Sequence, residues 1–344
     1  MENFKYLIRI PNHLGDAIMA WPAVKAFLES NETETIALMM PKWAEPLYKN
    51  IKHSKIILLP SNRLHGLGAI YFQAKLLRSY NIENAVLLTP SFSSALIIFM
   101  AGIKSRFGYQ GDNRNLLLNN NLKLPKNNIA HRSERYKLLL EKAGKKRLNI
   151  QMPQITVSDS LKKEAVELLE KNGINKTAKY IVIAPQAIAE SRRWGSKNYS
   201  VMAGKLIKNK NLKIVLVGTA DQYDAGQEIT AGEQQIVNLC GKTDIVQAAS
   251  ILSGALIFIG NDSGLAHLAS MVDIPLLVLS GADNPKETSP LSNKKTVIIR
   301  HDLECISCVK NVCPKSGEDF MQCMKDISVE EAFEIASKIL NNPL

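Results

Sequence analysis

The segment ALIFIGNDSGLAHLASM (residues 255–271) passes from an apolar run through the polar hinge Asn261-Asp262-Ser263-Gly264 into a second apolar pattern. A continuous apolar run is typical of a strand buried on both faces of a parallel sheet. The pattern after the hinge predicts a helix near residues 263–271. The segment therefore predicts one strand–turn–helix step of a doubly wound α/β fold.

The same alternation fills both halves of the chain and predicts two such α/β domains. The predicted strands are residues 5–10, 35–40, 54–60 and 84–88 in the first half and 180–185, 212–218, 255–260 and 275–281 in the second. The predicted helices lie near residues 16–29, 42–49, 66–79, 92–101 and 131–143, then 160–172, 197–208, 244–252, 263–271 and 328–342.

The domain boundary is predicted in the polar, proline-bearing link QMPQITVSDS at residues 151–160. This division gives a first domain of residues 1–155 and a second of residues 156–326, and it leaves residues 327–344 for a C-terminal helix. That helix is expected to open with a capping box from Ser328 to Glu331.

Length and composition indicate a globular protein of two domains, with 344 residues, 46% hydrophobic and 22% charged. No apolar stretch reaches the roughly 18 to 20 residues that a bilayer span needs, and the richest, SALIIFMAGI (residues 94–103), is far shorter. The first residues lack the pattern of an export leader, so a cytoplasmic location is expected.

The charge balance indicates an anionic partner, since the formal net charge is +11. Basic residues gather between Lys104 and Arg147. An ordinary solvated face is the alternative interpretation of such a run. Nucleic acid is not expected as the partner, because aromatic residues make up only 6% of the chain and few interleave with the basic run.

The first chemical motif, NHLGD (residues 12–16), follows the first predicted strand. Gly15 permits a tight turn, and Asp16 lies at or beside the start of a helix, where a parallel sheet presents groups to ligands. Asp16 can equally be a plain helix cap, and His13 either a base or a loop residue. No G-x-G-x-x-G dinucleotide fingerprint follows this strand.

The second motif is the hinge itself, with Asp262, Ser263 and Gly264 before a helix. The N–H groups and partial positive charge of a helix N-terminus suit a phosphate or diphosphate. The alternative is a helix capped by Asp262 with His267 packed in the interior. In the loop after the strand at residues 180–185, Arg192 and Arg193 can bind phosphate or face solvent, with Trp194 packing structurally.

Cys305, Cys308, Cys313 and Cys323 have the spacing C-x2-C-x4-C-x9-C. Such a set can supply four thiolates to a structural zinc or iron, or form a reduced loop without metal. A cytosolic location disfavours disulfides. Cys240 is expected to be buried.

Four sequence blocks in order resemble glycosyltransferase family 9, the heptosyltransferases, and within it the ADP-heptose:lipopolysaccharide heptosyltransferase II type. The blocks are LGDAIMAWPA (14–23), TPSFSSALIIFMAGIKSRFGYQGDNRNLLL (89–118), SRRW (191–194) and NLCGKTDIVQAASILSGALIFIGNDSGLAHLASMVDIPLLVLSGADNPKETSPL (238–291). The resemblance extends from residue 7 to about residue 325. Such coverage is far more specific than any single motif.

The resemblance implies a GT-B fold of two Rossmann-like domains facing a cleft, with the final helix packing back on the first domain. It also implies an inverting transfer of L-glycero-D-manno-heptose from its ADP derivative to the inner core of lipopolysaccharide. The acceptor would be Kdo-lipid A or heptosyl-Kdo2-lipid A, reached at the cytoplasmic face of the inner membrane by a peripheral protein that also contacts the anionic lipid surface.

By the same resemblance, Asp16 is the general base and Arg192 stabilises the departing diphosphate. The family usually has lysine at the position of Arg192, and arginine keeps the charge but changes the reach. Donor-binding residues would be Arg193, Asp262, Ser263, Gly264, Leu265 and His267. Acceptor-binding candidates are Asn12, His13, Arg63, Arg106, Arg114, His131 and Arg135, and Arg132 lies among them in the basic segment.

No cofactor is expected to be required, since the chain has no D-x-D motif for a catalytic metal. Other interpretations stay open at this point. They are a family 9 enzyme with another sugar nucleotide, one with a protein acceptor, the type that adds the first heptose, and a binding scaffold without turnover.

Overall fold

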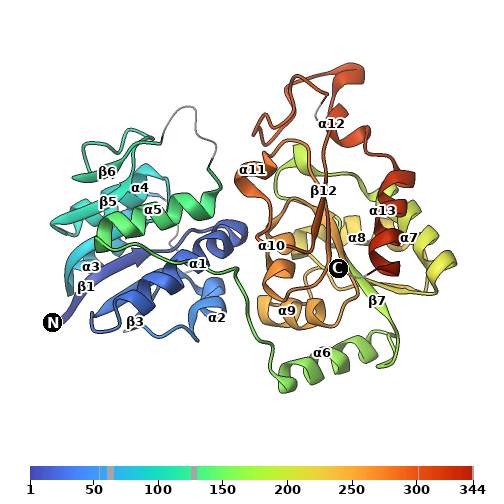
Figure 1. Cartoon of the computed structure of the whole chain (residues 1–344), viewed down its shortest axis with the longest axis horizontal. Coiled ribbons are helices and arrows are strands. Elements are labelled where there is room, and N and C mark those ends of the chain that lie inside the picture. Colours follow the sequence, from blue (N-terminus) through green and yellow to red (C-terminus); the bar gives the residue numbers. More distant parts are fainter. Residues whose placement is uncertain (54, 60–65, 125–129, 301, 343–344) are drawn as a thin grey trace. The chain divides into compact units, whose positions relative to one another are not determined.

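The computed structural model describes residues 1–53, 55–59, 66–124, 130–300 and 302–342. The chain divides into two compact units, Met1–Pro153 and Gln154–Leu344 (Figure 1). The division falls inside the polar link at residues 151–160. Arg63 lies outside the described residues.

The first unit is built on a parallel sheet with the strand order β3-β2-β1-β4-β5-β6. Its strands are β1 Glu2–Arg9, β2 Ile36–Pro41, β3 Lys55–Leu59, β4 Tyr80–Leu87, β5 Ser105–Tyr109 and β6 Asn120–Leu122. Ile8 in the central strand pairs with Leu38 on one side and Val86 on the other. The strand β2 and the last three residues of β4 (85–87) are apolar and buried, which explains why the sequence pattern found them.

Helices cover both faces of this sheet. They are α1 Leu14–Ser30, α2 Glu45–Tyr48 with the 3-10 turn η1 Lys42–Ala44 before it, α3 Leu67–Arg78, α4 Phe92–Met100 and α5 Arg132–Gly144. Leu7 belongs to the apolar cluster that includes α3 and α4. Tyr6, its neighbour in the strand, points to the other face, where its ring lies 5.1 Å from that of Phe27 in α1 and its hydroxyl donates to the carbonyl of Ala143 in α5.

The second unit repeats this plan, with the strand order β12-β11-β10-β7-β8-β9 and parallel pairing throughout. Its strands are β7 Tyr180–Ala184, β8 Lys213–Leu216, β9 Ile236–Asn238, β10 Phe258–Asn261, β11 Leu276–Leu279 and β12 Lys295–Ile298. In both units the first and fourth strands along the chain are neighbours at the centre of the sheet. This is the order of a doubly wound fold, so the predicted fold class is confirmed.

The helices of the second unit again lie in two groups. They are α6 Asp159–Lys171, α7 Ser196–Lys210, α8 Tyr223–Thr230, α9 Ile245–Ser253, α10 Gly264–Met271, α11 Pro285–Thr288, α12 Gln322–Lys325 and α13 Val329–Asn341, with 3-10 turns η2 Glu190–Arg192, η3 Ala220–Gln222 and η4 Gly317–Asp319. One apolar cluster joins the sheet to α7, α8 and α13 (Figure 1). The helix α6 packs on α9, which also contacts α10.

The final helix, α13, belongs to the second unit. Ala332, Ala336 and Ile339 form its apolar stripe and are buried in the cluster with α7. The predicted capping box is half formed: the Ser328 hydroxyl accepts the Glu331 N–H at 3.1 Å. The Glu331 carboxylate pairs with Arg300 instead of closing the box.

Among the described helices, none is both long and apolar enough to cross a bilayer.

Candidate functional site

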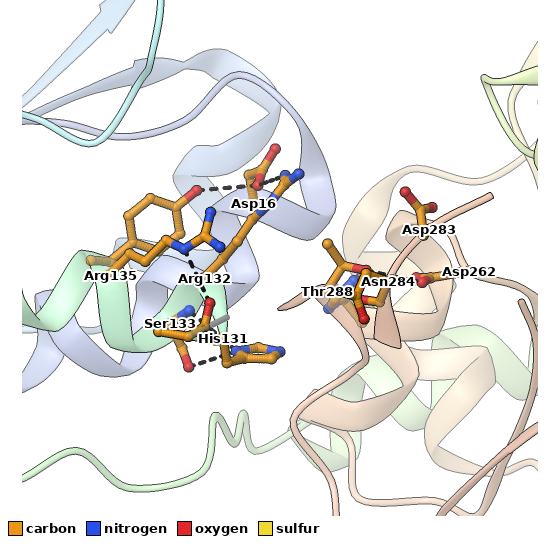
Figure 2. Close-up of polar contacts among 12 residues, drawn as sticks. Asp16, His131, Arg132, Ser133, Arg135, Asp262, Asp283, Asn284 and Thr288 are labelled. Carbon is orange, nitrogen blue, oxygen red and sulfur yellow. Dashed lines mark hydrogen bonds and ion pairs between the residues drawn. The ribbon is translucent and has the colours of Figure 1, made fainter. Parts of the chain in front are cut away.

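The first site lies at the carboxyl ends of β1 and β4, where the winding of the first sheet reverses direction. Asp16 stands in the first turn of α1, whose N-cap position is His13, without a side-chain cap bond. The Asp16 carboxylate is therefore not a helix cap. Its Oδ1 accepts a bond from Arg132 Nη1 at 2.7 Å and another from the Tyr136 hydroxyl at 3.1 Å (Figure 2).

Tyr136 is a hydrogen-bond donor in this arrangement. Burial is the largest cause that raises the pKa of its phenol well above the ordinary value, and the negative charge of Asp16 raises it further. The phenol therefore stays protonated at any physiological pH and cannot compete with Asp16 for a proton.

A pocket of about 410 Å³ opens at this carboxylate. Its lining brings together Asp16 and several basic or polar side chains of the sequence prediction. It also includes polar residues that the prediction did not select, among them Thr89, Ser91 and Tyr109. The predicted residues in the lining are Asn12, His13, Asp16, Arg114 and Arg135, and Arg132 lies with them. Cations outnumber the one carboxylate of the lining, so this pocket favours an anionic ligand.

Arg114 is the most deeply buried cation of this pocket, with 2% of its surface exposed. Its Nη1 donates to the carbonyl of Thr89 at 2.6 Å, while its buried Nε has no hydrogen-bond partner among the described residues. Burial lowers the pKa of this guanidinium. A buried cation without a carboxylate bound to it is costly unless an anion arrives, which makes Arg114 a candidate ligand for an acidic group.

Asn12 is oriented by a residue that the sequence reasoning missed. Arg9 in β1 is buried, and burial lowers its pKa to about 10. Its Nη2 donates to Asn12 Oδ1 at 2.6 Å and its Nη1 to the carbonyl of Ile10. A charged residue inside the apolar run YLIRI (residues 6–10) was the signal available in the sequence.

Two predicted acceptor residues do not line this pocket. Arg106 donates to the carbonyls of Leu117 and Ile103, both at 2.6 Å, and so ties its own loop together. His131 is the N-cap of α5, where its Nδ1 accepts the Ser133 N–H at 3.2 Å. Arg106 and His131 therefore each have a local structural role.

The second site lies at the carboxyl ends of β7 and β10, the equivalent position in the second sheet. Asn261 ends β10 and is fully buried. Its Oδ1 accepts the Trp194 N–H and the Tyr199 hydroxyl, both at 3.1 Å, and its Nδ2 donates to the carbonyl of Pro185 at 2.9 Å. The first residue of the hinge therefore joins the loops that follow the two central strands.

Asp262 is buried, and its Oδ2 accepts the Thr288 hydroxyl at 3.2 Å, while its Oδ1 lies 3.9 Å from His267 Nε2. The expectation that Asp262 caps α10 is wrong, because Ser263 holds the N-cap position. The Ser263 hydroxyl is buried and makes no hydrogen bond among the described residues. It stands beside the first-turn N–H groups of Gly264 and Leu265, which have no intrahelical acceptor.

Arg192 ends the 3-10 turn η2 and forms an ion pair with Asp283, whose side chain is buried (labelled in Figure 2). Arg192 Nε lies 2.6 Å from Asp283 Oδ2, at an angle that does not meet hydrogen-bond geometry. The Arg192 side chain is 28% exposed, so part of the cation is accessible to a ligand.

The neighbouring residues of this loop are used differently. Arg193 Nε donates to the carbonyl of Ala187 at 2.9 Å, which folds the guanidinium onto its own loop. Trp194 is buried, stacks edge-on against Tyr199 and donates to the carbonyl of Ile327 at 2.8 Å. The structural role expected for Trp194 is confirmed.

The segment with the four spaced cysteines is bonded to both loops of this second site. The Ser191 N–H donates to the carbonyl of Asn311 at 3.2 Å, and the Val309 N–H donates to that of Ala282 at 2.7 Å. Cys305 is exposed, whereas Cys308, Cys313 and Cys323 are partly buried, and all four are free thiols. Within the described ranges, no three His, Cys, Asp or Glu side chains are grouped as metal ligands. Cys240 is buried, as expected.

Two doubly wound units, each with polar groups at the carboxyl ends of its central strands, are typical of enzymes that bind nucleotides or their derivatives. The sequence profile of glycosyltransferase family 9 (heptosyltransferase) matches residues 71–317. The lipopolysaccharide heptosyltransferase 2 of Salmonella typhimurium is 32% identical over 86% of this chain and 87% of its own length. The lipooligosaccharide heptosyltransferase 2 of Haemophilus influenzae is 30% identical over 97% of this chain and 99% of its own.

The solved structure of the Escherichia coli ADP-heptose lipopolysaccharide heptosyltransferase II superposes with a TM-score of 0.79, at 28% identity and with 98% of each chain covered. The chain therefore belongs to glycosyltransferase family 9, the heptosyltransferases, and its fold is GT-B. It is a glycosyltransferase, as the sequence blocks predict.

Proposed function

We propose that this glycosyltransferase moves heptose from ADP-L-glycero-D-manno-heptose to the inner core of lipopolysaccharide, with heptosyl-Kdo2-lipid A as the acceptor. The observation that supports the proposal is that the single carboxylate of the first pocket, Asp16, lies among basic side chains. Asp16 is also the residue that the resemblance to heptosyltransferases predicts as the base. Similarity to heptosyltransferases named 2 over nearly the whole chain supports the choice of heptose and of the second position.

In this mechanism Asp16 accepts the proton of an acceptor hydroxyl as the hydroxyl oxygen attacks the anomeric carbon of the donor. A new carbon–oxygen bond forms while the bond between the anomeric carbon and the diphosphate oxygen breaks. ADP leaves with the bonding electron pair, and the configuration at the anomeric carbon inverts. One base on the acceptor side is therefore sufficient.

The departing diphosphate gains negative charge, which the second unit is equipped to stabilise. Arg192 supplies a cation, and the first-turn N–H groups of α10 at Gly264 and Leu265 supply donors and a partial positive charge. Asp262 and His267 would bind or support the donor sugar and diphosphate. Because Arg192 and these N–H groups neutralise the leaving group, turnover is expected to be unchanged in the presence of EDTA.

The acceptor carries acidic groups, since Kdo has a carboxylate and lipid A has phosphates. Arg114 and Arg135 line the pocket at Asp16 and match this charge. The basic segment and the net charge of +11 also suit an anionic lipid surface, so we place the reaction at the cytoplasmic face of the inner membrane. Sedimentation with vesicles containing acidic phospholipids, weakened by salt, is the expected result for that location.

The testing experiment measures ADP release from ADP-heptose with Kdo2-lipid A that carries one heptose, and with the same acceptor without heptose. Release that requires the first acceptor supports the proposal. Release with the second acceptor alone would move the assignment to the first heptose. Release from another sugar nucleotide but not from ADP-heptose would reject the donor, and donor binding without turnover on either glycolipid would favour a scaffold or a protein acceptor.

A further inference from the structure

The two contacts of Asp16 fall on the same carboxylate oxygen. Arg132 Nη1 and the Tyr136 hydroxyl both donate to Oδ1, at 2.7 and 3.1 Å. Among the described residues Oδ2 receives no hydrogen bond, while Asp16 lines the pocket with its side chain 18% exposed. One oxygen is thus held by protein donors, and the other remains for an incoming hydroxyl.

The two donors come from one face of one helix. Arg132 begins α5 and Tyr136 follows four residues later, a spacing that places both side chains on the same side. The helix α5 packs against α1, which carries Asp16. Their approach is close at Gly144, because a Cβ atom there would lie 2.7 Å from the ring of Phe27. Helix packing therefore fixes the donors relative to the carboxylate.

We propose that Arg132 and Tyr136 are positioning residues for Asp16: they hold Oδ1, so that Oδ2 faces the pocket and accepts the proton of the acceptor hydroxyl. This inference rests on the proposed role of Asp16 as the base. Neither residue accepts that proton, since Arg132 is a cation and the phenol of Tyr136 already carries its own proton. Their effect is on the orientation and charge of the carboxylate.

An alternative role for Arg132 is direct binding of an acidic group of the acceptor, as for Arg114. The two roles predict different kinetics. A ligand for the acceptor mainly changes the acceptor KM, whereas a residue that positions the base changes kcat. Tyr136 provides a second test of the two roles. A protonated phenol carries no positive charge, so its loss should not weaken the binding of an acidic acceptor.

The experiment measures kcat and acceptor KM for Arg132→Gln and Tyr136→Phe in the full chain, each alone and combined with Asp16→Asn. We expect kcat to fall about 100-fold for Arg132→Gln and about 10-fold for Tyr136→Phe, with acceptor KM changed less than about 3-fold. Arg132→Lys should recover part of the loss. In the Asp16→Asn background, residual product measured by mass spectrometry should be unaffected by either substitution, because the group they position is gone.

Two control variants match the chemical changes. Arg147→Gln removes an arginine from the same basic segment, where its side chain is 94% exposed. Tyr48→Phe removes another buried hydroxyl, which donates to the carbonyl of Ala17 at 2.7 Å but does not contact the carboxylate. Both controls should keep kcat within about 3-fold of the wild-type value. Thermal melts of all variants separate loss of folding from loss of positioning.

Three results would overturn the inference. The first is a raised acceptor KM for Arg132→Gln at unchanged kcat, which assigns Arg132 to the acceptor. The second is a loss in the Asp16→Asn background as large as in the wild type, which makes the effects independent of Asp16. The third is a Tyr48→Phe loss equal to that of Tyr136→Phe, which assigns the effect to packing. Wild-type turnover by Asp16→Asn would instead reject the base, and with it the proposed mechanism.

Discussion

The two units have the same strand order but present opposite chemistry at equivalent crevices. In the first unit, the residues after β1 and β4 form a pocket in which basic side chains surround the single carboxylate of Asp16. In the second unit, the residues after β7 and β10 place two buried carboxylates, Asp262 and Asp283, beside one partly exposed cation and a helix N-terminus. The fold fixes where the groups lie, and the loops decide what they do.

In the proposed mechanism, the difference corresponds to the two halves of a glycosyl transfer. A proton must leave the acceptor, which needs a base close to an acidic substrate. A diphosphate must leave the donor, which needs positive charge and N–H donors without a competing free carboxylate. In the second unit Asp283 is paired with Arg192 and Asp262 with Thr288, so neither is an isolated charge facing a phosphate.

The largest expected contrast between the two units is that between Asp16→Asn and Asp262→Asn. Asp16→Asn should lower kcat by about 1000-fold and leave ADP binding unchanged, because only the proposed base is lost. Asp262→Asn should instead weaken ADP-heptose binding, since the bond from Thr288 and the contact with His267 are disturbed. Calorimetric titration with ADP-heptose, together with turnover, checks both. Equal losses of kcat with normal binding in both variants would contradict the division of labour.

A second prediction compares the two adjacent arginines. Arg192→Gln should lower kcat by about 100-fold, because the developing charge on the diphosphate loses its cation. Arg193→Gln should keep kcat within about 3-fold and lower the melting temperature, because its guanidinium binds the carbonyl of Ala187. Steady-state kinetics and thermal melts measure the contrast. A greater kcat loss for Arg193→Gln would transfer the phosphate role to that residue.

A third prediction concerns the acceptor pocket and the buried Arg114. Arg114→Gln should raise the acceptor KM by about 10-fold while the donor KM stays unchanged, since a charge-assisted bond to an acidic group is lost. The matched control is Arg106→Gln, whose guanidinium binds the carbonyls of Leu117 and Ile103 outside the pocket lining. An unchanged acceptor KM in Arg114→Gln would show that the buried cation serves the fold alone.

The central architecture could be predicted from the sequence, because the buried strands are continuous apolar runs with helices between them. The strands β5, β6, β9 and β12, which lie at a sheet edge or next to one, were missed. Segments such as NNL at residues 120–122 have few apolar residues and owe their strand form to pairing with a neighbour. The contact of α13 with α7 could not be predicted either. Its apolar stripe is visible in the sequence, but the partner surface on α7 is not.

The candidate site also has a part that could be predicted from the sequence and a part that could not. Asp16 and the hinge at residues 261–264 could be found because each directly follows a buried strand, where parallel sheets bind ligands. The contacts of Asp16 could not be found, because Arg132 and Tyr136 lie 116 and 120 residues away along the chain. The same holds for Arg192 with Asp283. Nothing local in the sequence signals such long-range pairs.

The smallest expected effect is on the alkylation rates of the cysteines. These rates distinguish a metal site at the four spaced cysteines from a reduced loop without metal. Burial is the largest cause that raises the pKa of Cys323, to about 11, and that of buried Cys240, also to about 11. Because the thiolate is the nucleophile, alkylation of metal-free protein near pH 8 should be fast at exposed Cys305 and slow at Cys323 and Cys240. Raising the pH toward 11 should accelerate Cys323, and the stability that its protonated thiol contributes should be lost over the same range.

A bound metal would change this order in a specific way. Zinc or iron on the four spaced thiols would protect Cys305 as well as Cys323, and a strong chelator would then expose both, while Cys240 would stay slow before and after. Elemental analysis of protein purified without added metal checks the same point: about one atom per chain supports a structural metal. Fast alkylation of Cys305 without chelator, with metal content far below that level, assigns the segment to a reduced loop held by its bonds to Ser191 and Ala282.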